Sequence, residues 1–123
     1  MMPASSTSAM DRARDALRSL HARDGVVGAL LATRDGISLL HEGGSFGNVE
    51  SFAAMQATAL GAAEVALQSM AAKKAVGLVI DVGERRVLAR AVTEDLLVCI
   101  MVGANVPIEQ AFGWMDEAGA AMR

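Results

Sequence analysis

The segment from Asn48 to Ala72 constrains the fold of this chain more than any other. It runs for more than twenty residues without proline, is rich in alanine, and carries a single charged side chain in its interior, Glu64. A helix at the surface of a monomeric domain normally has one polar, charged face. The segment is therefore predicted to form a long helix that is covered on more than one side.

Helical periodicity divides this segment into two stripes. At 100° per residue, one face gathers the side chains expected to pack on the core, with Gln56 among them: Phe52, Ala59, Leu60, Ala63, Leu67 and Met70. The opposite face carries small or uncharged residues: Ala54, Thr58, Gly61, Val65 and Gln68. The helix could be buried on both sides within one domain, but a small chain has few other elements to cover it. We expect the second stripe to pack against another subunit.

Composition indicates one domain with its own core. The chain has 123 residues, of which 53% are hydrophobic and 20% charged. We expect a flexible tail over residues 1–9 and a single domain over 10–123. The net charge of −3 and the 3% of aromatic residues argue against nucleic-acid binding. No stretch resembles a signal peptide or a membrane span, so we expect a cytoplasmic protein without direct membrane insertion.

Hydrophobic patterning predicts the order helix, strand, strand, helix, strand, strand, strand, helix. Ser8 followed by Asp11 is typical of a helix start, and Asp35-Gly36 between two apolar runs predicts a hairpin. The predicted strands cover residues 26–33, 37–42, 75–82, 87–92 and 96–102. The first and last of these strands are apolar on both faces. The predicted fold class is therefore α+β, a single five-stranded antiparallel sheet with the long helix on one face and the terminal helices on the other.

No pattern in the sequence predicts catalysis, a cofactor or a metal. The glycine-rich run at residues 43–47 lacks the lysine of a phosphate-binding loop. His21 and His41 have no neighbour at metal-ligand spacing, and Cys99 lies in an apolar run typical of a buried side chain. We therefore predict no catalytic, cofactor-binding or metal-binding residue, and a protein that is not an enzyme.

The order of elements and the residues at their junctions resemble the Roadblock/dynein light chain (Roadblock/LC7) superfamily, in particular its prokaryotic, MglB-like members. The resemblance covers the chain from about Met10 to the C-terminus. The matching residues are Leu17, Leu20, the run from Gly25 to Leu31, Asp35-Gly36, Phe52-Ala53-Ala54, Ala57, Leu60 and Thr93-Glu94-Asp95. Abundant alanine and arginine with little lysine suit a prokaryotic source, so dynein is the less expected partner.

This resemblance implies a homodimer, or a heterodimer with a paralogous Roadblock chain. In such dimers the third strands pair across a two-fold axis and the long helices pack together. The implied interface combines the helix stripe with the third strand: Ala54, Thr58, Gly61, Val65, Val76, Leu78 and Ile80.

The resemblance also implies that the chain regulates or scaffolds a small Ras-like GTPase. The implied contacts flank the seam, which is the second stripe of the long helix where the two subunits meet. They are Gln56, Ala57, Glu64 and Gln68. An alternative function is a small-molecule sensor, with a ligand pocket between the sheet and the helices. The absence of an interior cavity would count against that alternative.

Overall fold

The computed structural model describes residues 8–44, 46–70 and 77–123. Within these ranges the elements follow the predicted order. They are α1 (Ala9–His21), β1 (Val26–Thr33), β2 (Ser38–Glu42), α2 (Val49–Gln68), β3 (Leu78–Asp81), β4 (Arg85–Ala91), β5 (Leu96–Gly103) and α3 (Ile108–Met122).

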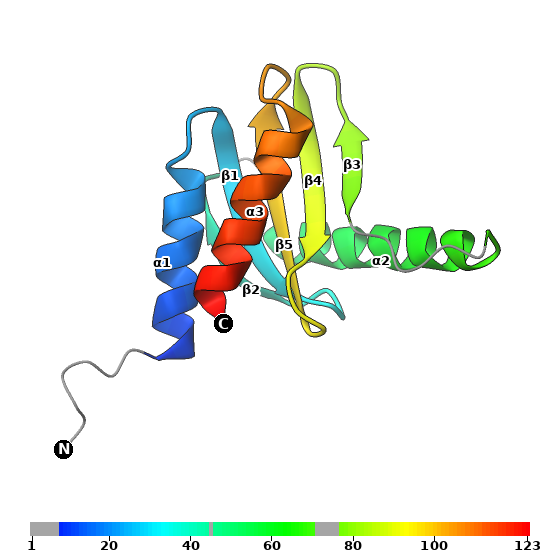
Figure 1. Cartoon of the computed structure of the whole chain (residues 1–123), viewed down its shortest axis with the longest axis horizontal. Helices are drawn as coiled ribbons and strands as arrows, with labels where there is room; N and C mark the ends of the chain where they lie inside the picture. Colours follow the sequence, from blue (N-terminus) through cyan, green and yellow to red (C-terminus); the bar gives the residue numbers. More distant parts are fainter. Residues whose placement is uncertain (1–7, 45, 71–76) are drawn as a thin grey trace.

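The five strands form one antiparallel sheet in the order β2-β1-β5-β4-β3. Helices α1 and α3 lie side by side on one face, and α2 crosses the other (Figure 1). This arrangement confirms the predicted fold class. The third strand, β3, lies at one edge of the sheet.

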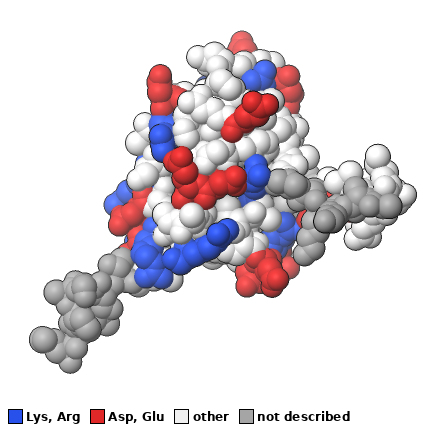
Figure 2. Space-filling view, in the orientation of Figure 1, with Lys and Arg blue, Asp and Glu red and all other residues white. Residues whose placement is uncertain are grey.

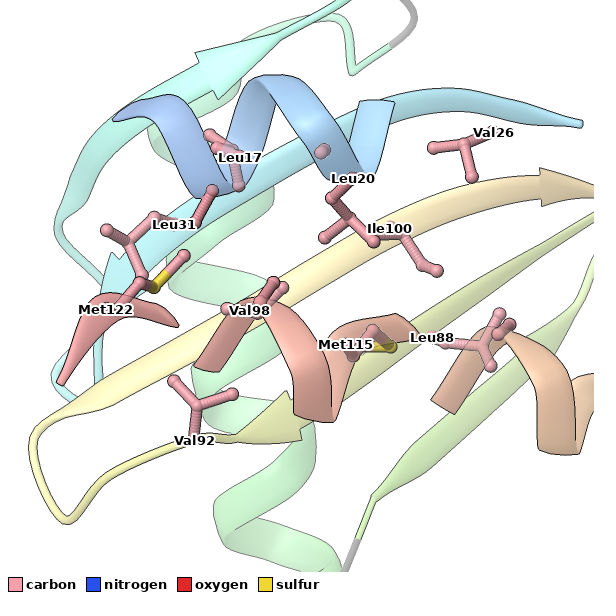
Figure 3. Packing of buried hydrophobic residues seen from close by; sticks show 14 of the residues in the cluster. Leu17, Leu20, Val26, Leu31, Leu88, Val92, Val98, Ile100, Met115 and Met122 are labelled. Carbon is pink, nitrogen blue, oxygen red and sulfur yellow. The ribbon is translucent and has the colours of Figure 1, made fainter. Parts of the chain in front are cut away.

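Two hydrophobic clusters hold the layers together, one on each face of the sheet. Alternate residues of β1 supply the two clusters, so Leu31 faces α1 and α3, whereas Leu30 faces α2. Figure 3 shows the cluster beneath α1 and α3, where Ile100 of β5 and Met115 of α3 are fully buried. The central strands are therefore covered on both faces, as their continuous apolar character predicts.

Side-chain caps fix where two of the helices begin. The Ser8 hydroxyl accepts a hydrogen bond from the Asp11 backbone N–H at 3.0 Å. The Asn48 side chain accepts one from the Ser51 N–H at 2.9 Å. Each bond satisfies a donor that has no partner within its own helix, so both starts follow from local sequence.

Some predicted boundaries differ from the structure. β4 begins at Arg85, two residues before the predicted start, because Arg85 and Arg86 already pair with β5. Ile37 precedes β2 and is 62% exposed. The predicted end of the long helix at Ala72 lies outside the described residues.

Gly36 in the β1–β2 turn is a sensitive test of how α2 packs on the sheet. Its φ is +93°, and a Cβ added there would lie 2.8 Å from the Cα of Ala54 in α2. We expect Gly36→Ala to lower the free energy of unfolding by about 2–4 kcal/mol, through left-handed strain and overpacking. Urea titration followed by circular dichroism measures this change. Gly44→Ala is the matched control, since no atom lies within 4 Å of an added Cβ there. Equal effects at both positions would contradict the proposed close contact.

A candidate protein interface on the long helix

Helix α2 exposes a broad uncharged surface. Its sheet-facing side is buried at Ala53, Gln56 and Leu60. On its other sides Met55 is 70% exposed and Val65 is 66% exposed. Met70, which follows the end of the helix, is 72% exposed. Figure 1 shows that α2 extends well beyond β3, and in Figure 2 the visible part of this projecting end carries no charge. Apolar surface of this kind on a small domain is typical of a protein interface.

The structure corrects part of the predicted division into stripes. Met70 was expected on the core face, yet it is exposed because the end of α2 has no sheet of its own chain beneath it. Ala59 is only half-buried. On the second stripe Ala54, Thr58, Val65 and Gln68 are exposed as predicted, and Gly61 is half-exposed with open space around it.

One side of α2 rests against the β1–β2 turn, and we call it the turn-side flank. It is formed by Ala54, Ala57, Gly61, Glu64 and Gln68, which follow each other at spacings of three and four. Gly36 packs against Ala54 and Ala57, and the Arg34 guanidinium makes an ion pair with the Glu64 carboxylate. The Arg34 and Glu64 side chains are only 28% and 18% exposed. Both contacts hold this flank close to the turn.

The opposite side of α2 we call the far flank. It is formed by Ala59, Ala63 and Ala66 and is continued by Met70 just past the helix end, and none of these residues is charged. In Figure 1 β3 starts level with α2 and runs upward, whereas the β1–β2 and β4–β5 turns lie below α2. The far flank is therefore on the side toward which β3 extends.

The four residues expected to contact a GTPase do not share one exposed surface. Gln68 is exposed and Ala57 is half-buried. Gln56 is 6% exposed, and its Oε1 has no hydrogen-bond partner among the described residues. Glu64 is held by Arg34. The side chain of Gln56 is therefore not exposed as expected, whereas Glu64 stays partly exposed beside Arg34, and the role of the four in binding stays a prediction.

Strand β3 offers a second surface, continuous with α2. One of its edges pairs with β4, and within the described ranges no strand pairs with the other. Leu78 packs on the α2 side of the sheet, and Val79 and Ile80 are each 37% exposed. Val76, also expected at this interface, lies outside the described residues. An unpaired, largely apolar edge is a template for adding another strand.

Two hollows in the described surface do not have the position of the expected sensor pocket. One lies between α1 and α3, where Arg23 stacks 5.5 Å from the centre of the Trp114 ring and pairs with Glu117 at 2.6 Å. Another lies at the β3–β4 turn. Neither lies between the sheet and a helix layer.

The described residues provide neither a cluster of metal ligands nor a reactive thiol. They include no cluster of three His, Cys, Asp or Glu side chains that could hold a metal ion. Burial raises the pKa of the Cys99 thiol to about 12, which keeps it protonated and unreactive near neutral pH. No helix within the described ranges is long and apolar enough to span a membrane.

Comparison with known proteins identifies the fold. No family model and no curated protein matches the sequence. The structure of an MglB with a tetrameric arrangement superimposes with a TM-score of 0.82 at 16% identity, over 99% of this chain and 94% of that one. The gliding protein MglB from Thermus thermophilus gives the same TM-score and identity, over 99% and 95% of the two chains. A Roadblock/LC7 domain from Streptomyces avermitilis gives 0.80 at 13% identity, over 88% and 92%. The chain therefore has the Roadblock/LC7 fold, which confirms the fold that the sequence resemblance implied.

The Arg34–Glu64 ion pair is expected to stabilise the packing of α2. Glu64→Gln removes the negative charge and leaves the partly buried guanidinium without its counter-ion. We expect the free energy of unfolding to fall by about 1–2 kcal/mol, between the values typical of exposed and buried pairs. Glu84→Gln in the exposed β3–β4 turn is the control, with an expected change below about 0.5 kcal/mol. Matching urea midpoints for the two variants would show that the ion pair contributes no net stability.

Proposed function

We propose that this chain is a non-enzymatic Roadblock/LC7 regulator or scaffold, a prokaryotic MglB-like protein that works as a dimer and binds a small Ras-like GTPase. The observation that carries the proposal is the exposed, uncharged surface of α2 beyond the sheet edge. The matched structures support it, since two of them are MglB, one described as a gliding protein and one as tetrameric. A role in gliding-type motility and in self-association is the corresponding expectation here.

Dimerisation about a two-fold axis at the free edge of β3 would bury the apolar surface of α2 and that of β3 together. Two β3 strands would pair antiparallel, and each α2 would extend over the partner's sheet. Because β3 runs to the far-flank side of α2, the two α2 helices would face each other through Ala59, Ala63, Ala66 and Met70. We therefore place the helix contact on the far flank and the outermost residues of α2, rather than on the predicted seam centred on Gly61.

The energetics favour such a dimer. Burying an exposed Met or Val side chain contributes about 1.5–3 kcal/mol. Met55, Val65 and Met70 together supply several such contributions, which offset the entropy lost on association. The alanines between them allow the helix backbones to approach closely.

The residues of α2 limit how the chain could affect hydrolysis by a GTPase. Helix α2 contains no Lys or Arg, so no arginine finger projects from it. Any effect on hydrolysis would then act through the partner's own residues, for example by favouring one conformation of its switch loops. Gln68 and Ala57 are the predicted contacts that the structure leaves accessible.

Engineered cysteines test the proposed dimer directly. The native thiol of Cys99 is buried, so a single new cysteine reports on its own position. We expect Ala62→Cys or Ala66→Cys to form a disulfide-linked dimer under mild oxidation, because both residues lie on or beside the face turned to the partner. Non-reducing gels at low protein concentration show the product.

Gly61→Cys and Gln68→Cys are the matched controls on the turn-side flank. They are expected to stay monomeric on the same gels while light scattering still reports a dimer before denaturation. If only the Gly61→Cys variant forms a cross-link, the dimer interface lies on the predicted seam instead. A monomer by light scattering at micromolar concentration would contradict the dimer.

Binding to a GTPase is tested with the wild-type chain as bait. Small GTPases recovered from the source organism are identified by mass spectrometry, purified, and titrated by calorimetry with GDP or a GTP analogue bound. We expect Gln68→Arg to weaken binding about tenfold while leaving the dimer intact, because it adds a cation to an uncharged contact. Gln110→Arg on the exposed face of α3 is the control and should bind like wild type. Recovery of no GTPase, or hydrolysis of GTP by the purified chain alone, would contradict the proposal.

A further inference from the structure

We infer that the partner docks where the β1–β2 and β4–β5 turns meet the turn-side flank of α2, and that it presents an apolar patch bordered by Lys or Arg. This inference rests on the proposed function, because it names the surface that holds the same partner. It also states the chemistry that the partner must offer.

The two turns and the helix form one continuous surface. Gly36 packs on Ala54, and the backbone N–H of Arg34 donates to the Asp95 carbonyl at 2.9 Å. The Arg34 side chain reaches α2 through Glu64. The Thr93 hydroxyl accepts from the N–H groups of Asp95 and Leu96 at 3.1 and 3.0 Å, which fixes the β4–β5 turn. The surface is therefore preformed by backbone and side-chain contacts.

The centre of this surface is apolar. Ile37 follows Gly36 directly and is 62% exposed, and Ala54 and Thr58 are exposed on the adjoining helix. The uncharged surface of α2 thus continues onto the β1–β2 turn. An exposed isoleucine at this position contributes nothing to the core and favours a contact with another molecule.

Three carboxylates lie in the two turns that adjoin this apolar centre. Asp35, Glu94 and Asp95 are exposed, and none of their carboxylates makes an ion pair or hydrogen bond within the described part of the chain. Figure 2 shows acidic side chains gathered at this end, below α2. The cation that lies among them, Arg34, is already neutralised by Glu64, and Arg123 donates to the Val92 carbonyl from the α3 side. The potential here is negative, which attracts a basic partner surface and repels phosphates.

The proposed dimer leaves this surface open. The free edge of β3 and the far flank lie on the other side of α2, so a second copy would not cover Asp35, Ile37 or Asp95. A second copy would also bring the same carboxylates and repel them. A partner with basic side chains around an apolar patch is the occupant that fits.

The test uses the 123-residue chain and, as probe, the GTPase recovered by the wild-type chain, purified with a GTP analogue bound. Asp35→Lys/Asp95→Lys reverses the acidic border, and Ile37→Ser removes the apolar centre. We expect the double reversal to weaken binding about tenfold or more at low salt, and less at high salt where charges are screened. Ile37→Ser should weaken binding about fivefold at both salt concentrations, because its contact is uncharged.

Matched controls lie on the other face. Asp24→Lys/Glu109→Lys makes the same change of charge at exposed sites, and Met10→Ser removes an apolar side chain that is 43% exposed on α1. Both should bind like wild type. Circular dichroism and light scattering establish that every variant is folded and dimeric, and Asp35→Asn/Asp95→Asn replaces the reversal if it does not fold.

Each outcome decides the inference. Wild-type affinity in both turn variants overturns the inference and leaves the proposed function standing, because the GTPase then docks elsewhere. Equal weakening by turn variants and controls shows a general charge effect and overturns it too. Loss of the dimer in folded turn variants assigns the surface to a second copy. A wild-type chain that recovers no GTPase overturns the proposed function and this inference together.

Discussion

The need to cover both faces of the β1–β5 pair is the constraint on which the rest of this structure depends. Leu30 and Cys99 are fully buried on one face, and Leu31 and Ile100 are buried on the other. Neither face can be left in water, so the chain must supply a helical layer on each side. Helices α1 and α3 share one layer, whereas the single helix α2 forms the other. A single helix crossing a sheet of five strands covers it only by being long.

The length of α2 links the fold to the proposed function. The helix has 20 residues, and its last turns pass the edge of the sheet. Apolar residues near the end of the helix have no sheet beneath them, so they are exposed. Met70 is an example. The same edge carries β3, a strand paired on one side. Such surfaces are sufficient for the regulatory role that we propose, because a regulator needs only to favour one state of its partner.

The contacts of the β1–β2 turn determine how α2 lies on the sheet. Gly36 touches the helix at Ala54, and Arg34 pairs with Glu64 about three turns further along. These two contacts fix the rotation of the helix about its axis. They turn one flank toward the acidic turns and leave the opposite flank free beside β3. The division of α2 that we propose, between a second copy and another partner, depends on that rotation.

The sequence by itself determined the element order, the helix starts at Ser8 and Asn48, the Asp35-Gly36 hairpin and the two-faced central strands. These features depend on residues close to each other in the chain, on caps, turn glycines and alternation. It also predicted that α2 is uncharged on its outer side. Only the tertiary structure decided which flank of α2 packs against the β1–β2 turn, because Arg34 and Glu64 are 30 residues apart and meet through folding. It also decided that Gln56 is buried and Met70 is not. Periodicity reports the angle of a residue around a helix axis, but not where along that axis the sheet beneath it ends.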